Sequence, residues 1–308
     1  MGNYLITGGS GFVGSHFVGR LIEAGHRVHV IDVRSEDPHT KTHPKAIYHN
    51  ADITDTAVID LIDEIQPDYV YHLATAFSSP TNNHDVKDIV EVNVLGTINV
   101  LEGAVKANVK RFVFTSTGAV YGQPAYIGMD ENHPLCPVTP YGMTKRSAEE
   151  FVQLYNRLYD LPYTILRLAT VYGMRQLTFS DGDLIADLIQ KYMHHSPVTL
   201  KGDGQYSRDF IYIEDVLDVL EICISRGSNA VFNIGSGHGT LLNELINLLN
   251  ATFEMHVEPN FVPNDHTQVK DSYFDISHAL AQLDWSPRFD LADGILETVH
   301  YYRRTLRM

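Results

Sequence analysis

The sequence predicts an α/β protein built on a doubly wound parallel sheet. Over the first two-thirds of the 308 residues, short β-rich apolar runs alternate with amphipathic stretches, which is the pattern of βαβ units. A glycine-rich turn directly follows the first apolar run and opens a helix, and an aspartate ends the second run. These observations together favour a sheet that binds a nucleotide.

Six apolar runs are predicted to be strands, and helices are expected between them. The strands are Tyr4–Thr7, Arg27–Asp32, Ala46–Asn50, Tyr69–His72, Arg111–Thr115 and Tyr163–Leu168. The first helix, Phe12–Ala24, has Gly25 as its expected C-cap. The run Asp88–Ala107 places its apolar residues on one broad face, so it is predicted to be a helix packed on the sheet. Pro140 suits the first turn of a further helix.

Beyond Tyr172 the alternation loosens. A helix is expected around Leu184–Met193, and Phe210–Tyr212 and Val231–Ile234 again have the composition of strands. We therefore predict a nucleotide-binding domain over residues 1–172, to which 210–235 returns. The remainder, 173–209 and 236–308, is predicted to form a smaller, partly interleaved substrate domain.

The glycine-rich turn has a mechanism for holding a pyrophosphate. Gly8 allows the tight turn, Gly11 lets backbone N–H groups approach the phosphates at the helix N-terminus, and Gly14 lets the helix lie close to the sheet. The cofactor-binding residues expected in this turn are Gly8, Gly11, Phe12, Val13 and Gly14. This context predicts a Rossmann-type dinucleotide site.

Asp32 selects the dinucleotide. It ends the second strand about 20 residues after the turn, where an acid hydrogen-bonds the adenosine ribose. The extra phosphate of NADP, about 4 Å from this carboxylate, would cost on the order of 4 kcal/mol. NAD is therefore the expected cofactor, although Arg34 is able to offset part of that repulsion.

Tyr141 and Lys145 lie four residues apart, so a helix that begins at Pro140 stacks their side chains on one face. A free phenol has a pKa of about 10, and holding it as phenolate near pH 7 needs about 4 kcal/mol of stabilisation. A lysine cation and a cationic cofactor ring are able to supply that. The alternative is an ordinary surface helix that carries both residues.

Composition argues against several other classes of function. The chain has 23 Lys and Arg against 38 Asp and Glu, a formal charge of −15, so neither nucleic acid nor an anionic membrane is an expected partner. No apolar run approaches the roughly 20 residues of a membrane-spanning helix, and Met1 leads almost directly into a strand, so a cytoplasmic location is predicted. Cys136 and Cys223 form no CxxC, and the histidines lack ligand spacing, so no disulfide framework or metal site is expected.

Further motifs follow the glycine turn in order along the chain. They are Ala51-Asp52-Ile53, His72-Leu73-Ala74-Thr75, Asn93-Val94-Leu95-Gly96-Thr97, TSTGAVYG from Thr115 to Gly122, Tyr141-x-x-x-Lys145, Arg167-x-x-Thr170-Val171-Tyr172-Gly173 and Gly202-Asp203-Gly204-x-x-x-Arg208-Asp209-Phe210. With TGGSGFVG and Asp32, they make the chain resemble the extended short-chain dehydrogenase/reductases over essentially its whole length. The resemblance is to the NAD-dependent sugar-nucleotide epimerase/dehydratase family, and nearest to its UDP-sugar 4-epimerases.

The resemblance implies further contacts with the cofactor. Asp52 and Ile53 would meet the adenine, and Asn93 would support the wall formed by three residues that follow the fourth strand. Those three residues are Leu73, Ala74 and Thr75. For Asn93 a helix-start hydrogen bond is the alternative.

The resemblance also implies three catalytic residues. Thr117 would hydrogen-bond the reacting sugar oxygen, and Tyr141 would take the hydroxyl proton while NAD⁺ accepts hydride from the same carbon. Lys145 would lower the pKa of Tyr141 and hold the nicotinamide ribose. For Thr117 an ordinary strand threonine is the alternative.

Gly118 and Ala119 indicate which reaction to expect. Related dehydratases carry an Asp-Glu pair there and decarboxylases a Glu, whereas Gly118 and Ala119 carry no proton. The resemblance then implies epimerisation at C4 of a UDP-hexose or UDP-hexuronic acid through a transient 4-keto sugar. A net NAD-dependent dehydrogenase or ketoreductase and an NAD-binding protein without catalysis remain as alternatives, and a 4,6-dehydratase is disfavoured.

For the substrate, the resemblance implies that Arg208 grips the nucleotide pyrophosphate, since its fork binds phosphate in a bidentate manner. Pairing with Asp209 is the alternative role. Ser78 and Thr170 are further candidate substrate contacts, and Thr170 stands where an asparagine is commonest. The stretch Pro263–Lys270 lacks the second phosphate-binding arginine that relatives often have.

The resemblance finally suggests a homodimer. Two helices of each subunit would form its interface, and the candidates are Asp88–Ala107 and Met143–Asp160. The sequence does not distinguish a dimer face from a face packed on the sheet.

Overall fold

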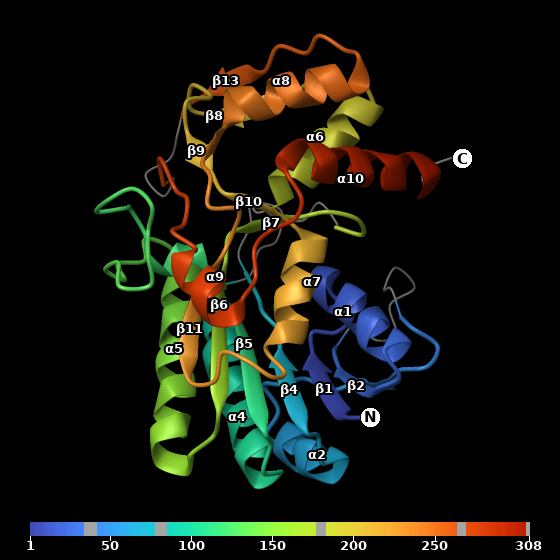
Figure 1. Ribbon diagram of the computed structural model, residues 1–308, viewed down its shortest axis with the longest axis vertical. Helices are drawn as coiled ribbons and strands as arrows, with labels where there is room; N and C mark the ends of the chain where they lie inside the picture. The colour runs from blue at the N-terminus through green and yellow to red at the C-terminus, as the bar shows by residue number, and fades with distance from the viewer. Residues whose placement is uncertain (34–41, 78–84, 177–182, 264–268, 306–308) are drawn as a thin grey trace.

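The computed structural model describes residues 1–33, 42–77, 85–176, 183–263 and 269–305. At its centre is a seven-stranded sheet in the order β11-β6-β5-β4-β1-β2-β3, in which every neighbouring pair is parallel (Figure 1). The chain moves outward from β1 to β3 and then returns to β4 on the other side of β1. That reversal defines a doubly wound sheet, so the predicted fold class is confirmed.

Every strand predicted for the first two-thirds of the chain is present, with ends shifted by at most one or two residues. The strands of the central sheet are β1 (Asn3–Thr7), β2 (Arg27–Ile31), β3 (Ile47–His49), β4 (Tyr69–His72), β5 (Arg111–Thr117), β6 (Tyr163–Leu168) and β11 (Ala230–Ile234). Strand β5 runs two residues further than predicted, to Thr117. This extension brings Thr117 to the carboxyl edge of the sheet.

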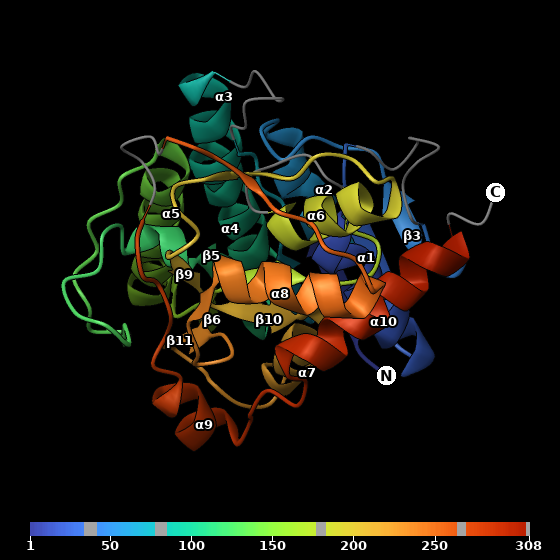
Figure 2. The same cartoon turned by 90° about the horizontal axis from the view of Figure 1, so that it is seen from above.

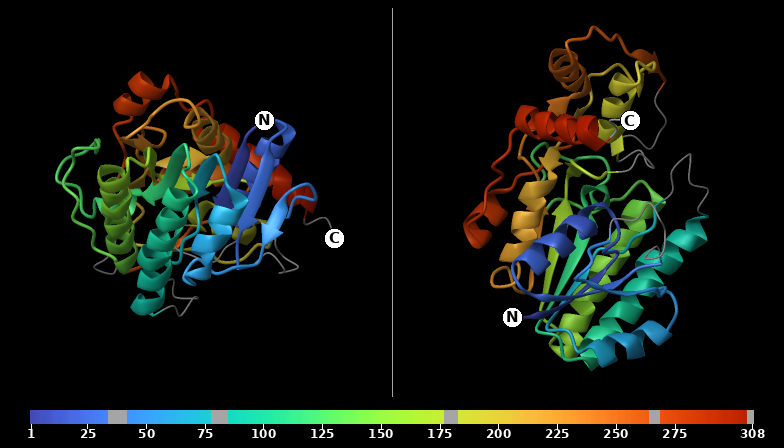
Figure 3. Two further views of the ribbon diagram at one scale, coloured as in Figure 1. Left: turned by 90° about the horizontal axis from the view of Figure 1, so that it is seen from below. Right: turned by 90° about the vertical axis from the view of Figure 1, so that its right-hand side faces the viewer.

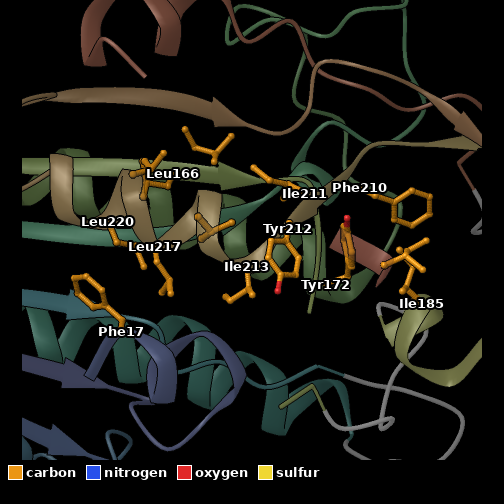
Figure 4. Packing of buried hydrophobic residues seen from close by; sticks show 14 of the residues in the cluster. Phe17, Leu166, Tyr172, Ile185, Phe210, Ile211, Tyr212, Ile213, Leu217 and Leu220 are labelled. Carbon is orange, nitrogen blue, oxygen red and sulfur yellow. The ribbon is translucent and has the colours of Figure 1, made fainter. Parts of the chain in front are cut away.

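Helices cover both faces of the sheet (Figure 3). On one face α2 (Ala57–Ile65), α4 (Thr97–Lys106) and α5 (Pro140–Tyr159) pack against each other and the strands. On the other face α1 (Phe12–Glu23) packs against α7 (Ile213–Ile222), and Figure 4 shows Phe17 of α1 facing Leu217 and Leu220 of α7. Within the described ranges, no helix is long and apolar enough to cross a membrane.

The C-terminal part of the chain lies across the carboxyl ends of the central strands (Figure 2). The helices that lie there are α6 (Leu184–Met193), α8 (Leu242–Phe253) and α10 (Leu291–Thr305), whereas α9 (Ser277–Leu283) packs beside the edge strand β11. The short strands of this part pair as β7 (Thr170–Tyr172) with β10 (Phe210–Tyr212), β9 (Ser207–Arg208) with β12 (Thr240–Leu241), and β8 (Thr199–Lys201) with β13 (Asn260–Val262). Phe17 and Tyr172 belong to one continuous buried cluster, and the division into two domains stays a prediction.

The helix predicted over Asp88–Ala107 is not regular. It consists of α3 (Val86–Val90), a π-helical turn (Glu91–Gly96) and α4. The wider turn contains Asn93, whose amide bonds the backbone of Ala76, and Gly96, where a Cβ would lie 2.7 Å from the Ile53 side chain. The π turn coincides with these tertiary contacts, which helix periodicity does not reveal.

Candidate active site

A cavity of about 900 Å³ opens at the carboxyl edge of the central sheet. Its size is in the range of small-molecule sites, which is roughly 300–1,000 Å³. It brings together most of the residues that the sequence singled out. Those in its walls are Gly8, Gly11, Phe12, Val13, Gly14, Asp32, Asp52, Ile53, Leu73, Ala74, Thr75, Thr117, Tyr141 and Lys145.

The glycine turn forms one end of this cavity because it has no room for side chains. Gly8 has a φ of +71°, and a Cβ there would lie 2.6 Å from the Ala74 nitrogen. A Cβ on Gly14 would lie 2.4 Å from the Gly8 carbonyl oxygen. Gly11 is the N-cap of helix α1 and has no side chain to cap the helix. The first backbone N–H groups of α1 are therefore available to an anion.

Asp32 lies directly after β2 and is buried. Its Oδ2 accepts a hydrogen bond from the Ser10 backbone nitrogen at 3.0 Å, which ties the acid to the glycine turn. The Ser10 hydroxyl oxygen lies buried in the cavity wall without a hydrogen-bond partner in the described structure. A phosphate oxygen or ribose hydroxyl would satisfy that hydroxyl, so this end of the cavity fits a dinucleotide.

Asn93 lies behind the cavity wall. Its Oδ1 accepts hydrogen bonds from the Ala76 nitrogen at 2.8 Å and the Thr75 hydroxyl at 3.1 Å. Its Nδ2 donates to the Ala76 carbonyl at 2.7 Å and to the Thr144 hydroxyl at 3.1 Å. Asn93 therefore joins the loop after β4 to helix α5. Its hydrogen bonds go beyond the helix-start bond that was the alternative role for this residue.

Thr117 and Tyr141 both line the cavity, and their side chains are hydrogen-bonded to each other. Thr117 ends β5, and its hydroxyl oxygen accepts a hydrogen bond from the Ala119 nitrogen at 3.2 Å, which caps a short 3₁₀ turn over Gly118–Val120. The pKa of Tyr141 is raised because burial disfavours the phenolate, while hydrogen bonds from Thr75 and Thr117 act in the lowering direction.

Lys145 lies one helical turn after Tyr141, and its side chain is buried with Nζ 4.1 Å from the centre of the Phe114 ring. Burial lowers the pKa of Lys145 to about 7, and the charge of Glu149 acts to raise it. The sequence predicted that Lys145 lowers the pKa of Tyr141. In the structure burial has the largest influence on the pKa of Tyr141 and raises it, so the effect of Lys145 on the phenol stays a prediction.

Some residues in and behind the cavity were missed at the level of sequence. Arg175, which has a φ of +65°, lines the cavity and donates from Nη1 to the Ser15 carbonyl at 3.2 Å, beside the first turn of α1. Glu149 lies behind Lys145 and is buried. Its spacing of four residues from Lys145 and eight from Tyr141 is the signal that would have found it.

Two candidate substrate residues, Arg208 and Thr170, are described but do not line this cavity. Arg208 donates from Nη1 to the carbonyls of Ser207, at 2.8 Å, and Lys270, at 2.6 Å, and it is not among the described residues that line the cavity. Thr170 belongs to β7 and likewise lies outside the cavity wall, although its neighbours Ala169 and Val171 are in it. Ser78 and Arg34 lie outside the described residues.

The cavity and fold agree with comparisons to known proteins. The model of the NAD dependent epimerase/dehydratase family matches residues 4–235. The crystal structure of UDP-glucose 4-epimerase with UDP-glucose from Thermotoga maritima is similar with a TM-score of 0.94 and 35% identity, over 99% of this chain and 100% of that chain. The crystal structure of UDP-glucose 4-epimerase from Thermus thermophilus, in complex with NAD, is similar with a TM-score of 0.91 and 28% identity. The match covers 97% of this chain and 98% of that chain.

A relative with another activity has a similar degree of identity. UDP-glucuronic acid decarboxylase 1 of Arabidopsis thaliana is 30% identical over 98% of this chain, and the match spans 70% of that protein. Similarity alone therefore does not separate epimerases from decarboxylases. The residues of the cavity have to do so.

Proposed function

Because the chain belongs to the NAD-dependent epimerase/dehydratase family, we propose that it interconverts the C4 epimers of a UDP-linked hexose or hexuronic acid. Its cofactor is NAD, in keeping with the family. The observation that carries the proposal is the meeting of Thr117 and Tyr141 in the cavity, with no acid at Gly118 or Ala119. The similarity to an epimerase structure that holds UDP-glucose supports the choice of substrate class.

In the proposed reaction Tyr141 is the acid and base. Its phenolate takes the proton of the sugar C4 hydroxyl, and the same phenol returns a proton after the 4-keto sugar has turned over in the site. When bound, NAD⁺ accepts the C4 hydride, later returns it, and adds positive charge beside the phenol. Thr117 holds the reacting oxygen, and hydrogen bonds with Thr75 and Thr117 oppose the effect of burial, which raises the pKa of Tyr141.

Lys145 has two roles in this proposal. Its ammonium group holds the nicotinamide ribose, and its charge stabilises the Tyr141 phenolate one turn away. Burial lowers the pKa of Lys145 to about 7, and the negative charge of Glu149 acts in the opposite direction and favours the ammonium form. Asp32 holds the adenosine ribose at the opposite end of the cavity.

The chemistry of Gly118 and Ala119 opposes the decarboxylase and dehydratase alternatives. Elimination of water needs an acid and a base in addition to Tyr141, and these two residues carry neither. The acids among the described residues of the cavity wall are Asp32, Asp52 and Asp183. Asp32 and Asp52 lie at the end proposed for adenosine, and Asp183 accepts a hydrogen bond from the Gln176 amide at 3.1 Å.

For the substrate we propose Arg208 as a contact of the nucleotide pyrophosphate and Ser78 and Thr170 as contacts of the sugar. Arg208 is held in place by the carbonyls of Ser207 and Lys270, which leaves further guanidinium N–H groups for phosphate. Its replacement by methionine is expected to raise the KM for the UDP-sugar with little change in NAD content. An unchanged KM would contradict the assignment of Arg208 to the substrate site.

We also propose a homodimer formed through α5 and the helical run from α3 to α4. Leu95, Met143 and Leu158 on these two neighbouring helices are about half exposed, at 50%, 49% and 60%. Leu158→Glu is expected to convert the dimer into a monomer in analytical ultracentrifugation. The cytoplasmic location stays a prediction.

The decisive experiment supplies the purified protein with each member of three pairs of C4 epimers, based on UDP-glucose, UDP-N-acetylglucosamine and UDP-glucuronic acid, without added NAD. Conversion within one pair, resolved by chromatography, is expected. A change in the near-ultraviolet absorbance of reduced nicotinamide during turnover would instead indicate a net oxidoreductase.

Tyr141→Phe tests the catalytic assignment. It is expected to lower kcat by about 10²–10⁴-fold while NAD is retained. Tyr159→Phe, an exposed position on the same helix, is the control and is expected to keep full activity. A Tyr141→Phe protein that retains most of its turnover would refute the role of the phenol.

A further inference from the structure

A buried carboxylate lies behind the proposed catalytic residues. Glu149 lies on α5 and is 2% exposed, and its carboxylate accepts hydrogen bonds from residues on the neighbouring strands β5 and β6. Its Oε1 accepts hydrogen bonds from the Ser116 hydroxyl and, at 3.1 Å, from Arg167 Nε. Its Oε2 accepts from Arg167 Nη2 at 2.7 Å, so the pair is bidentate.

This carboxylate connects α5 and β5, which supply the proposed catalytic residues, with β6, which contributes to the cavity wall. On α5 it lies one turn after Lys145 and two turns after Tyr141, on the same face of the helix. On β5 its partner Ser116 directly precedes Thr117. On β6 its partner Arg167 directly precedes Leu168, which lines the cavity.

The Arg167 guanidinium also donates a hydrogen bond away from Glu149. Its Nη1 donates to the Tyr121 hydroxyl at 2.9 Å, and that hydroxyl donates to Asn233 Oδ1 at 2.6 Å on β11. The guanidinium is therefore oriented by a hydrogen-bond network that extends to the edge strand. Such a network fixes the carboxylate of Glu149 in one position.

Among the described residues, few groups that can carry charge influence or contact Lys145. Tyr141 and Glu149 flank it on α5, and the charge of Lys145 contributes to lowering the pKa of His72 on β4, whose ring packs on Phe114. Phe114 covers its ammonium group from β5, and Arg167 on β6 lies beyond Glu149. Of these, the Glu149 carboxylate supplies the negative charge that opposes the effect of burial.

We propose that Glu149 is a positioning residue for the reaction, which keeps Lys145 protonated and, through Ser116, holds Thr117 in line with Tyr141. The inference rests on the proposed function for its catalytic meaning. A purely structural role, in which the Glu149–Arg167 pair only joins α5 to the sheet, is the competing explanation. The two differ in what happens to Lys145 when the charge of Glu149 is removed.

The test compares Glu149→Gln with Glu150→Gln. Both variants remove one carboxylate from α5, but Glu150 is exposed and pairs with Arg146 at the surface, with an Arg146 Nε to Glu150 Oε1 distance of 3.2 Å. Protonation of Lys145 is measured by its rate of carbamylation with cyanate, over a pH series that brackets neutrality, with the labelled peptide quantified by mass spectrometry. Only the unprotonated amine reacts, so the midpoint of labelling reports the pKa of Lys145.

In Glu149→Gln the midpoint is expected to fall by about one pH unit or more, because Glu149 lies one helical turn from Lys145 and a nearby opposite charge typically shifts a pKa by about 1–3 units. Below both midpoints, labelling of Lys145 then becomes about tenfold faster or more. Glu150→Gln is expected to label like the wild type. Equal midpoints in Glu149→Gln and the wild type would overturn the proposal.

Unpaired Arg167 is a risk to folding in the single variant. The double variant Glu149→Gln, Arg167→Met removes both buried charges together and is expected to fold, with Lys145 still titrating below its wild-type midpoint. A midpoint at or above the wild-type value in a folded double variant also overturns the proposal.

Turnover separates this inference from the proposed function. With a UDP-sugar pair that the wild type converts, Glu149→Gln is expected to shift the alkaline limb of kcat to lower pH by the same amount, with little change in KM. A loss of kcat that is equal at every pH would support the structural role. If the wild type converts no nucleotide sugar, the proposed function fails, and the labelling result still decides the role of Glu149.

Discussion

Gly14→Ala tests whether close packing of α1 on the glycine turn is what builds the cofactor end of the cavity. The added Cβ would lie 2.4 Å from the Gly8 carbonyl oxygen and 2.7 Å from the Gly9 Cα. Both are backbone atoms, so the helix or the turn must move by about 1 Å to reach an ordinary contact. Overpacking of this kind costs about 1–3 kcal/mol.

Gly19→Ala, in the same helix, is a matched control. A Cβ on Gly19 meets nothing within 4 Å, so this variant receives only the gain in helix propensity, up to about 1 kcal/mol. Gly14→Ala receives a similar gain and also the clash. The difference between the two free energies of unfolding therefore isolates the clash, and we expect it to be about 1–3 kcal/mol.

Thermal unfolding of the two variants, with and without NAD, measures this difference. Since about 1 kcal/mol moves Tm by roughly 2 °C in a chain of this size, Gly14→Ala is expected to melt about 2–6 °C below Gly19→Ala. The NAD retained through purification is expected to fall only in Gly14→Ala, because the displaced turn carries the N–H groups for the pyrophosphate. Equal melting and equal NAD content in the two variants would show that the contact between α1 and the turn does not shape this end of the cavity.

Three further predictions concern Asp32 in the cavity wall and the buried residues His72 and Asn93. Asp32→Ser is expected to reduce the preference for NAD over NADP by about tenfold or more, measured by calorimetric titration of both cofactors, and an unchanged preference would contradict the role of this carboxylate. Burial, and secondly the charge of Lys145, lowers the pKa of His72 to about 3, below the value of about 6.5 in the unfolded chain. The stability that comes from neutral His72 is therefore complete above about pH 6.5 and is lost as the pH falls toward 3, by at most about 1.4 kcal/mol per pH unit. In urea unfolding over a pH series, His72→Gln is expected to flatten that slope, and His238→Gln, at an exposed position, to leave it unchanged. Asn93→Ala leaves the Ala76 N–H and C=O without their partner, so it is expected to lower the free energy of unfolding by about 1–3 kcal/mol and to reduce the NAD retained through purification. A variant that melts like the wild type and retains as much NAD would show that the cavity wall does not depend on Asn93.

Much of the cofactor end could be predicted from the sequence because it depends on local rules. The glycine spacing and the acid after the second strand are fixed by the geometry of one βαβ unit. Parallel strands then bring their carboxyl ends to one edge, so residues that follow different strands, such as Gly8, Asp32 and Thr75, line the same cavity. Thr170 and Arg208 belong to short strands outside the central sheet, where no such rule places them.

Spacing within short stretches of chain was enough to specify the segments of the central strands, the glycine turn, and the stacking of Tyr141 and Lys145 on one helix. The folded chain was needed to learn that Glu149 meets Arg167 and Ser116, and that burial raises the pKa of Tyr141 and lowers that of Lys145. Desolvation and ion pairing depend on which distant segments pack around a group, and no local pattern encodes that arrangement.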